Sequence, residues 1–205
     1  MNNRSLPTEH GTFHCDGYAL ALALIDNCEV DALRTYVQAR LENNELRHGD
    51  LQVPKALCCY GDPRMDELLE RLVPRVESIV QRPVFPTYSY YRVYQHGDVL
   101  AKHRDRPACE ISLTLTLTCE GTDSWPLWVN RHGSPIAVTI PQGSGLLYRG
   151  TQIAHWREAF DGTSAMQVFL HYVTQDGPFA EWRFDRRSSL SHKKRPESFT
   201  SFEIV

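Results

Sequence analysis

A histidine and an aspartate two positions apart, joined later in the chain by a second histidine, are the residues of this sequence best suited to metal chemistry. The first two stand in His103-Arg104-Asp105, and His155 follows the glycine-rich stretch 143–150. Alternate residues of a β-strand point to the same side, so the side chains of His103 and Asp105 would project together. Two imidazoles and one carboxylate on one side of an ion hold Fe(II) and leave its other positions open for substrate and O₂. The pattern therefore predicts a mononuclear iron(II) site.

The surroundings of these residues carry a family resemblance. The segment 88–173 resembles the 2-oxoglutarate/Fe(II)-dependent dioxygenases, and among them the prolyl-hydroxylase-like group. The resemblance rests on YRVYQHGDVLAKHRD at 91–105, ISLTLTL at 111–117, GLLY at 145–148 and His155. It implies an α+β fold built on a double-stranded β-helix, the jelly-roll or cupin-like barrel, with two or more N-terminal helices packed on it.

The same resemblance implies a reaction. Fe(II) would bind 2-oxoglutarate and O₂, the 2-oxoglutarate would be decarboxylated to succinate, and a substrate C–H bond would be hydroxylated. His103, Asp105 and His155 are the iron ligands that it implies. Related halogenases replace the acid with Gly or Ala to admit a halide, so the intact Asp105 favours hydroxylation.

One position departs from the family pattern. In the family, an Arg or Lys about ten residues after the second histidine binds the C5 carboxylate of 2-oxoglutarate, but 158–182 contains no Lys or Arg. A dicarboxylate in a partly buried site needs a cation or several donors. Arg157 is the first candidate because it would share the inward face of His155 on a continuing strand. Gln167 offers a neutral donor, and Tyr94 matches a tyrosine that often binds the cosubstrate in relatives. Further candidate anchors are Arg92 and Arg149.

Other residues near the predicted site have simpler interpretations. Charged side chains beside the ligands are expected to be solvated, namely Lys102, Arg104 and Arg106. For Arg106, which lies past the strand end, the alternative is contact with an anionic group of the substrate. His171 is expected to be a hydrogen-bonded core residue. The six cysteines form no C-x-x-C pair and are expected to be reduced thiols.

Helical periodicity dominates the chain before residue 82. Asp31 is the expected N-cap of a first helix, and Asp62 with Pro63 marks the start of a second. Pro74 falls within that second pattern and should kink or break it. The stretch 18–25 fits either a strand or a buried helix.

From residue 88 the hydrophobic period becomes two, which is typical of strands. Expected strands cover 88–94, 111–118, 127–130, 136–140, 145–149 and 165–173. In 111–118 the alternation gives one apolar face and one hydroxyl face, which lies either in the interior or in water. The hydroxyl face consists of Ser112, Thr114, Thr116 and Thr118.

Length and composition predict one domain. We expect it to span 1–185, with a metal-binding core at about 88–173 and a polar tail at 186–205. The 205 residues are 41% hydrophobic with a formal net charge of −3, so the basic surplus of a general nucleic-acid binder is missing. No apolar run reaches membrane-spanning length, and the first residues show no secretory signal, so we expect a cytoplasmic protein with no membrane partner.

The substrate class stays open between alternatives. A small amino-acid-like molecule is the first expectation, and a prolyl-type side chain within a peptide is the second. A third possibility is a cupin-like module that binds a structural metal such as zinc without turning over 2-oxoglutarate.

Overall fold

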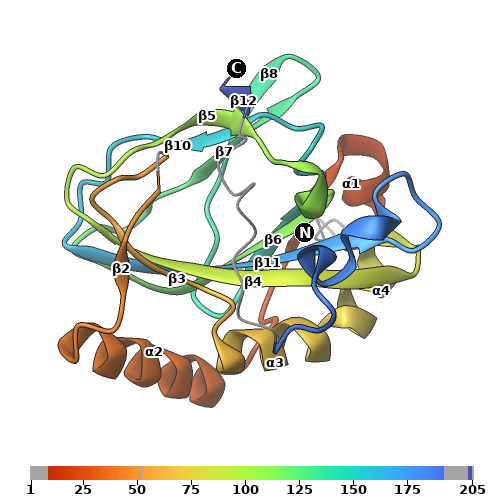
Figure 1. Ribbon diagram of the computed structural model, residues 1–205. Coiled ribbons are helices and arrows are strands. Elements are labelled where there is room, and N and C mark those ends of the chain that lie inside the picture. The colour runs from red at the N-terminus through yellow and green to blue at the C-terminus, as the bar shows by residue number, and fades with distance from the viewer. Residues whose placement is uncertain (1–8, 51, 192–202, 205) are drawn as a thin grey trace.

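The computed structural model describes residues 9–50, 52–191 and 203–204, and it combines helices with two antiparallel sheets. In Figure 1 the five-stranded sheet lies above the seven-stranded sheet, and helices α2 and α3 lie below the latter. The helices are α1 (Glu9–Asp16), α2 (Asn27–Glu42), α3 (Pro63–Arg71) and α4 (Val73–Val80), with short 3₁₀ segments η1 (Pro107–Cys109) and η2 (Ala180–Arg186). The predicted mixture of helix and sheet is therefore confirmed.

The larger sheet has the strand order β1-β9-β6-β11-β4-β3-β2. Its strands are β1 (Tyr18–Ala21), β2 (Arg47–His48), β3 (Leu57–Tyr60), β4 (Val84–Gln95), β6 (Ile111–Glu120), β9 (Gly145–Tyr148) and β11 (Ser164–Thr174). The smaller sheet has the order β12-β5-β10-β7-β8. It consists of β5 (Leu100–Arg104), β7 (Leu127–Arg131), β8 (Ser134–Val138), β10 (His155–Arg157) and β12 (Glu203–Ile204). The stretch beginning at Tyr18, left open between strand and helix, is a strand at its start.

The helix boundaries follow capping chemistry. Asp62 caps α3 by accepting from the backbone N–H of Arg64 at 3.0 Å, and Pro63 occupies the first turn, as predicted. The helical pattern breaks at Leu72, and Pro74 lies in the first turn of α4, so the expected break is also confirmed. The first cap was predicted at the wrong acid: Asp26, not Asp31, has the extended backbone of an N-cap and accepts from the N–H of residue 29 at 2.8 Å.

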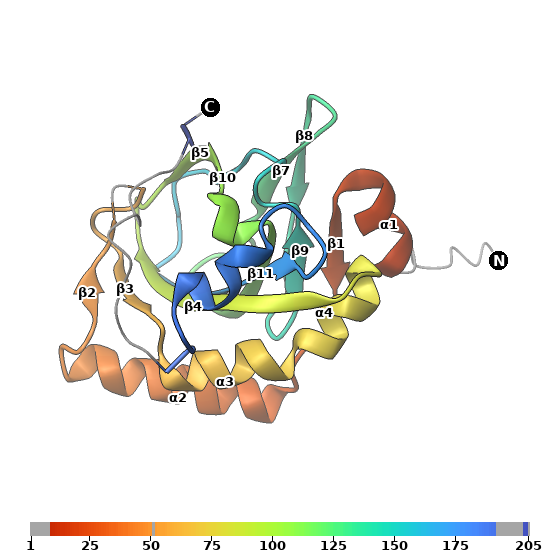
Figure 2. The same cartoon turned by 45° about the vertical axis from the view of Figure 1, so that its right-hand side comes forward.

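Two apolar clusters lie on opposite faces of the larger sheet. One lies between that sheet and the helices, which run along the sheet in Figure 2, and it includes Leu113 and Leu115 of β6. The other includes Tyr94 and Val129 and lies between the two sheets. Alternation in β6 therefore turns its leucines toward the helices and its hydroxyl residues toward the second sheet. This answers the question left open by the sequence, because Ser112 and Thr114 are buried.

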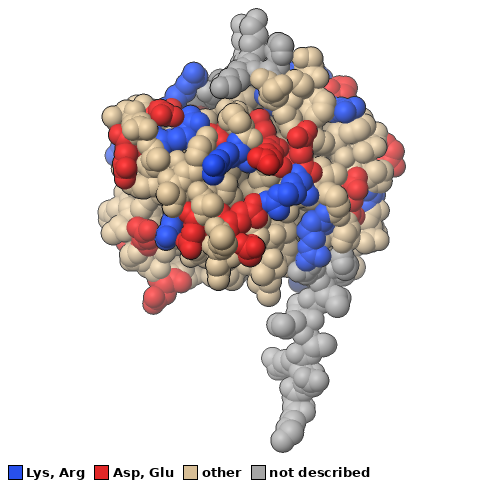
Figure 3. All heavy atoms as spheres, turned by 90° about the horizontal axis from the view of Figure 1, so that it is seen from below, with Lys and Arg blue, Asp and Glu red and all other residues tan. Residues whose placement is uncertain are grey.

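On the helix side of the molecule, the described surface carries charges of both signs, with no large patch of one sign. Figure 3 shows this side from below, with Lys and Arg interspersed among Asp and Glu. Among the described residues, no helix combines the length and apolar character needed to cross a membrane. The predicted tail begins by packing on the fold, since Leu190 is buried and Arg187 donates to the carbonyl of Thr87 at 3.2 Å. The rest of the tail, apart from β12, lies outside the described residues.

Candidate metal centre

The two sheet strands β5 and β10 bring the predicted triad together. His103 and His155 are register partners across these strands, and their ring centroids lie 4.2 Å apart. Asp105 follows the end of β5, where its Oδ1 lies 3.4 Å from Nε2 of His103 and 3.5 Å from Nε2 of His155. One ligand atom from each residue lies within 4.8 Å of the others, a spacing that a single metal ion can bridge.

Backbone carbonyls fix how the two imidazoles present themselves. Nδ1 of His103 lies 2.7 Å from the carbonyl of Ala101, and Nδ1 of His155 lies 3.0 Å from the carbonyl of Ile153. A carbonyl only accepts, so each Nδ1 carries a proton, and Nε2 is the ring atom left to bind a metal ion. Both Nε2 atoms face Asp105, so the donor set suits a divalent metal ion.

The carboxylate is oriented as firmly as the imidazoles. Ser112, on the buried hydroxyl face of β6, donates to Oδ2 of Asp105 at 2.6 Å, which leaves Oδ1 toward the histidines. Burial opposes ionisation, but the neighbouring His155 and His103 hold the pKa of Asp105 well below its usual range. The acid is therefore a carboxylate, the form that binds a cation.

Gly150 explains part of the glycine-rich stretch that precedes His155. Its carbonyl accepts from the backbone N–H of Asp105 at 2.9 Å. A Cβ at this position would lie 2.5 Å from Oδ2 of Asp105 and 2.3 Å from the carbonyl of Cys109. Only glycine lets this backbone approach the carboxylate so closely.

Arg157 is a buried cation that pairs with no acid in the described part of the chain. It is 1% exposed, donates to the carbonyl of Trp125, and lies 3.3 Å from Oε1 of Gln167. Its Nε is buried without a hydrogen bond, and within the described residues no carboxylate forms an ion pair with it. Burial lowers the pKa of Arg157, while the phenols of Tyr94 and Tyr148 oppose this shift. The structure thus brings Arg157, Gln167 and Tyr94 into one neighbourhood.

The other two candidate anchors have different surroundings. Arg92 is buried on β4 and forms an ion pair with Asp50, with a further hydrogen bond to Oε1 of Gln52 at 2.9 Å. Its positive charge is already matched by a carboxylate. Arg149 lies over the ring of Phe13 and donates a hydrogen bond to the backbone carbonyl of His14.

A narrow cavity of about 40 Å³ opens at the triad. Its walls come from both sheets and from the segment before β3; they include Asp50, Tyr90, Arg92, Tyr148, Phe169 and His171. Asp50 was missed by the sequence reasoning, because nothing local marks it and only the fold brings it to Arg92. His171 is a buried hydrogen-bonded residue, as predicted, with Nδ1 3.0 Å from Oγ of Ser112.

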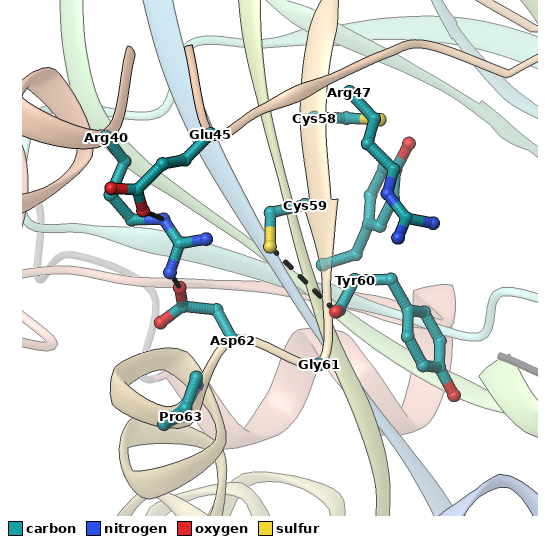
Figure 4. Close-up of a pocket in the computed structure, with 10 residues that line it drawn as sticks. Arg40, Glu45, Arg47, Cys58, Cys59, Tyr60, Gly61, Asp62 and Pro63 are labelled. Carbon is teal, nitrogen blue, oxygen red and sulfur yellow. Dashed lines mark hydrogen bonds and ion pairs between the residues drawn. The ribbon is translucent and has the colours of Figure 1, made fainter. Parts of the chain in front are cut away.

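A larger cavity, of about 210 Å³, lies beside β2 and β3 and has Tyr90 in common with the first (Figure 4). Three of its four charged groups pair with each other, since Arg40 lies 2.8 Å from a carboxylate oxygen of Asp62 and 3.5 Å from one of Glu45, and Arg47 is the fourth. None of the triad residues lines it. This cavity therefore offers no chemistry comparable with the metal centre.

Arg106 was expected in solvent, but it is buried. It forms a bidentate ion pair with Asp185, at 2.7 and 2.8 Å, and the hydroxyl of Tyr60 donates to the same carboxylate at 2.7 Å. To reach this position the chain takes left-handed φ values of 51°, 57° and 58° at residues 184–186. Such a conformation costs roughly 1–2 kcal/mol per non-glycine residue, so the ion pair holds a strained segment. Arg104, by contrast, lies on the partly exposed side as predicted.

Comparison with known proteins gives a fold. No family model and no curated protein matches the sequence. A prolyl-4-hydroxylase from Pseudomonas putida superposes with a TM-score of 0.66 at 16% identity, covering 81% of this chain and 97% of that one. SnoN, a non-heme alpha-ketoglutarate-dependent epimerase from nogalamycin biosynthesis, gives 0.69 at 13% identity, with 81% of both chains covered.

A third solved structure carries ligands. HygX from Streptomyces hygroscopicus, with nickel and 2-oxoglutarate bound, gives a TM-score of 0.66 at 13% identity, covering 84% of this chain and 89% of that one. These similarities confirm at the level of the fold what segment 88–173 predicted. The chain has the fold of the 2-oxoglutarate- and iron-dependent oxygenases.

Proposed function

We propose that this protein is an Fe(II)- and 2-oxoglutarate-dependent oxygenase that hydroxylates a C–H bond of a small amino-acid-like substrate. The observation that carries the proposal is the convergence of His103, Asp105 and His155, with both Nε2 atoms directed at one carboxylate oxygen. These three residues would hold the iron. Bound iron and 2-oxoglutarate would supply the oxidation by O₂, with release of succinate and CO₂.

The surrounding side chains have supporting roles in this proposal. Ser112 orients Asp105, and the carbonyls of Ala101 and Ile153 keep the imidazole protons on Nδ1. Arg157 would bind the C5 carboxylate of 2-oxoglutarate, assisted by Tyr94 and Gln167. A buried guanidinium without a counter-ion is costly, and an incoming carboxylate would remove most of that cost.

A free amino acid is favoured as substrate by the pair of opposite charges in the cavity wall. Asp50 and Arg92 form a buried ion pair there, with side chains 8% and 4% exposed. A zwitterion carries its ammonium and carboxylate groups close together and would find a partner for each. The cavity is narrow, so such a ligand would exchange these partners rather than occupy a preformed space.

A peptide hydroxylase is the second candidate, supported by the coverage of 97% of the Pseudomonas putida prolyl-4-hydroxylase. A zinc-binding module without turnover is a weaker candidate. Structural zinc sites are usually closed by a fourth protein ligand, whereas the group at the triad offers three.

Succinate formation tests the reaction. The chain is incubated with Fe(II), 2-oxoglutarate and O₂, with His155→Ala as the metal-site control, and 2-oxoglutarate binding is measured in parallel under anaerobic conditions. Succinate from the unchanged chain alone supports the proposal. Tight zinc with neither binding nor succinate would favour the binding module.

The substrate class is tested in the same assay. Free amino acids are compared with peptides that contain the same residues and have blocked termini. Faster turnover of free amino acids, lost in Arg92→Gln, supports the zwitterion site. Turnover of blocked peptides alone would identify a peptide hydroxylase.

A further inference from the structure

A buried thiol and a buried phenol contact each other beside the triad. Cys109 ends the short helix η1, Tyr88 lies on β4, and Sγ of the first is 2.9 Å from Oη of the second. The two residues are 1% and 3% exposed. Neither has a part in the proposed reaction, so the pair needs a separate explanation.

This pair lies beside the candidate metal centre, because Cys109 is a neighbour of the triad residue Asp105. Sγ of Cys109 is within 4.8 Å of a carboxylate oxygen of Asp105 and of a ring nitrogen of His171. Tyr88 also lines the cavity into which His103 and His155 point. An oxidant produced at the triad would therefore form next to an oxidisable thiol that water does not reach.

The phenol ring is held in place from several sides. The guanidinium of Arg106 lies 4.7 Å from its centroid, and the rings of Tyr60 and His171 lie at 5.0 and 4.5 Å. Arg106 is itself fixed by its bidentate ion pair with Asp185. The 2.9 Å contact holds Sγ at the hydroxyl end of the ring, where the ortho carbon is bonded to the carbon that carries that oxygen.

We propose that Cys109 and Tyr88 become joined by a thioether bond between Sγ and this ortho carbon. The inference rests on the proposed function, which supplies the oxidant when no substrate is present. The S–H and the ring C–H bonds break and the S–C bond forms, which releases two protons and two electrons. One oxygen atom of O₂ enters succinate as 2-oxoglutarate loses CO₂, and the other takes up these protons and electrons to become water.

The chain contains a matched pair that should not react. Cys59 and Tyr91 are register partners on β3 and β4, and both contribute to the cluster between the sheet and the helices. They combine the same two side-chain types on the opposite face of the sheet from the triad. Oxidation by a diffusing agent would not favour the buried Cys109 over Cys59, which is partly exposed.

Mass spectrometry of the full chain tests the proposal. The protein is incubated with Fe(II), 2-oxoglutarate and air without substrate, stripped of metal, treated with a thiol reductant that opens any disulfide, and weighed intact, while succinate is measured in the same sample. We expect a loss of two hydrogen atoms, about 2 Da, in place of the gain of about 16 or 32 Da that thiol oxidation to sulfenic or sulfinic acid gives. Trypsin should place Tyr88 in peptide 76–92 and Cys109 in peptide 105–131, which would run as one joined species.

The variants decide which residues are joined. Cys109→Ser and Tyr88→Phe should abolish the 2 Da loss, and Cys59→Ser should retain it. Succinate without the mass loss, oxygen added to Cys109, or equal linkage at Cys59 would overturn the cross-link and leave the proposed function intact. Absence of both succinate and the mass loss would overturn both.

Discussion

Replacing Arg157 by methionine should separate cosubstrate binding from folding. Methionine keeps much of the side-chain volume and removes the charge. Nη1 and Nη2 of Arg157 each donate one bond to protein and Nε donates none, so several N–H groups are left for a carboxylate. Loss of two hydrogen bonds to a charged ligand costs about 3–6 kcal/mol. The Kd for 2-oxoglutarate should therefore rise by about 100-fold or more.

Stability should respond differently. The substitution leaves the carbonyl of Trp125 without its donor, which costs about 1–3 kcal/mol. It also removes a buried charge that has no acidic partner, and the desolvation penalty of such a charge is several kcal/mol. The two effects offset each other, so the free energy of unfolding without ligand should change little or rise. In Arg92→Met, by contrast, Asp50 is left as a buried unpaired carboxylate, and the loss should be about 3–5 kcal/mol.

Two measurements test this contrast. Anaerobic calorimetric titration of the Fe(II)-loaded protein gives the Kd for 2-oxoglutarate, and urea unfolding of the metal-free protein gives the free energy. The reasoning is refuted if Arg157→Met binds 2-oxoglutarate as tightly as the unchanged chain. It is also refuted if this variant loses as much stability as Arg92→Met.

Three further predictions concern the groups around the site. Gly150→Ala should place a methyl group against Asp105 and weaken metal binding at least tenfold in a calorimetric titration; unchanged affinity would show that the backbone there can move. Asp185→Asn should lower the free energy of unfolding by about 3–5 kcal/mol in urea, because Arg106 would lose its buried partner, and a loss below about 1 kcal/mol would contradict this. Burial raises the pKa of Asp50, but the charge of Arg92 outweighs it and the pKa is lowered overall. The ion pair stabilises the fold fully above the ordinary carboxyl pKa of about 4, and this contribution is lost as the pH falls through the lower folded pKa. The unchanged chain and Asp50→Asn should therefore begin to converge in stability near pH 4 and meet below the folded pKa of Asp50.

The parts of the fold that sequence could predict are those set by local chemistry. Asp62 and Pro63 start a helix because a carboxylate cap and a fixed φ act within one turn. The alternation in 111–118 predicted the strand β6. It could not predict that the hydroxyl face of this strand is buried, because the second sheet that covers it comes from distant parts of the chain. The first cap was misplaced because Asp26 and Asp31 are both acceptable caps, and only the backbone turn chooses between them.

The candidate site divides in the same way. His103 and Asp105 could be paired from their spacing alone, and the resemblance added His155. Asp50 and Asp185 could not be found, because each reaches its arginine across a long sequence separation that only folding closes. Arg157 is buried, but the lack of a carboxylate partner among the described residues is a property of the packed interior that its position in the sequence does not indicate.

The ion pair between Arg106 and Asp185 also bears on the order in which the chain is synthesised. Arg106 directly follows Asp105, so the turn that presents the carboxylate is anchored by a residue that the ribosome adds much later. A nascent chain that has not yet reached residue 185 would bury a guanidinium without its partner. Formation of the candidate site is therefore expected to depend on completion of η2, so incomplete chains should not present the triad in its folded arrangement.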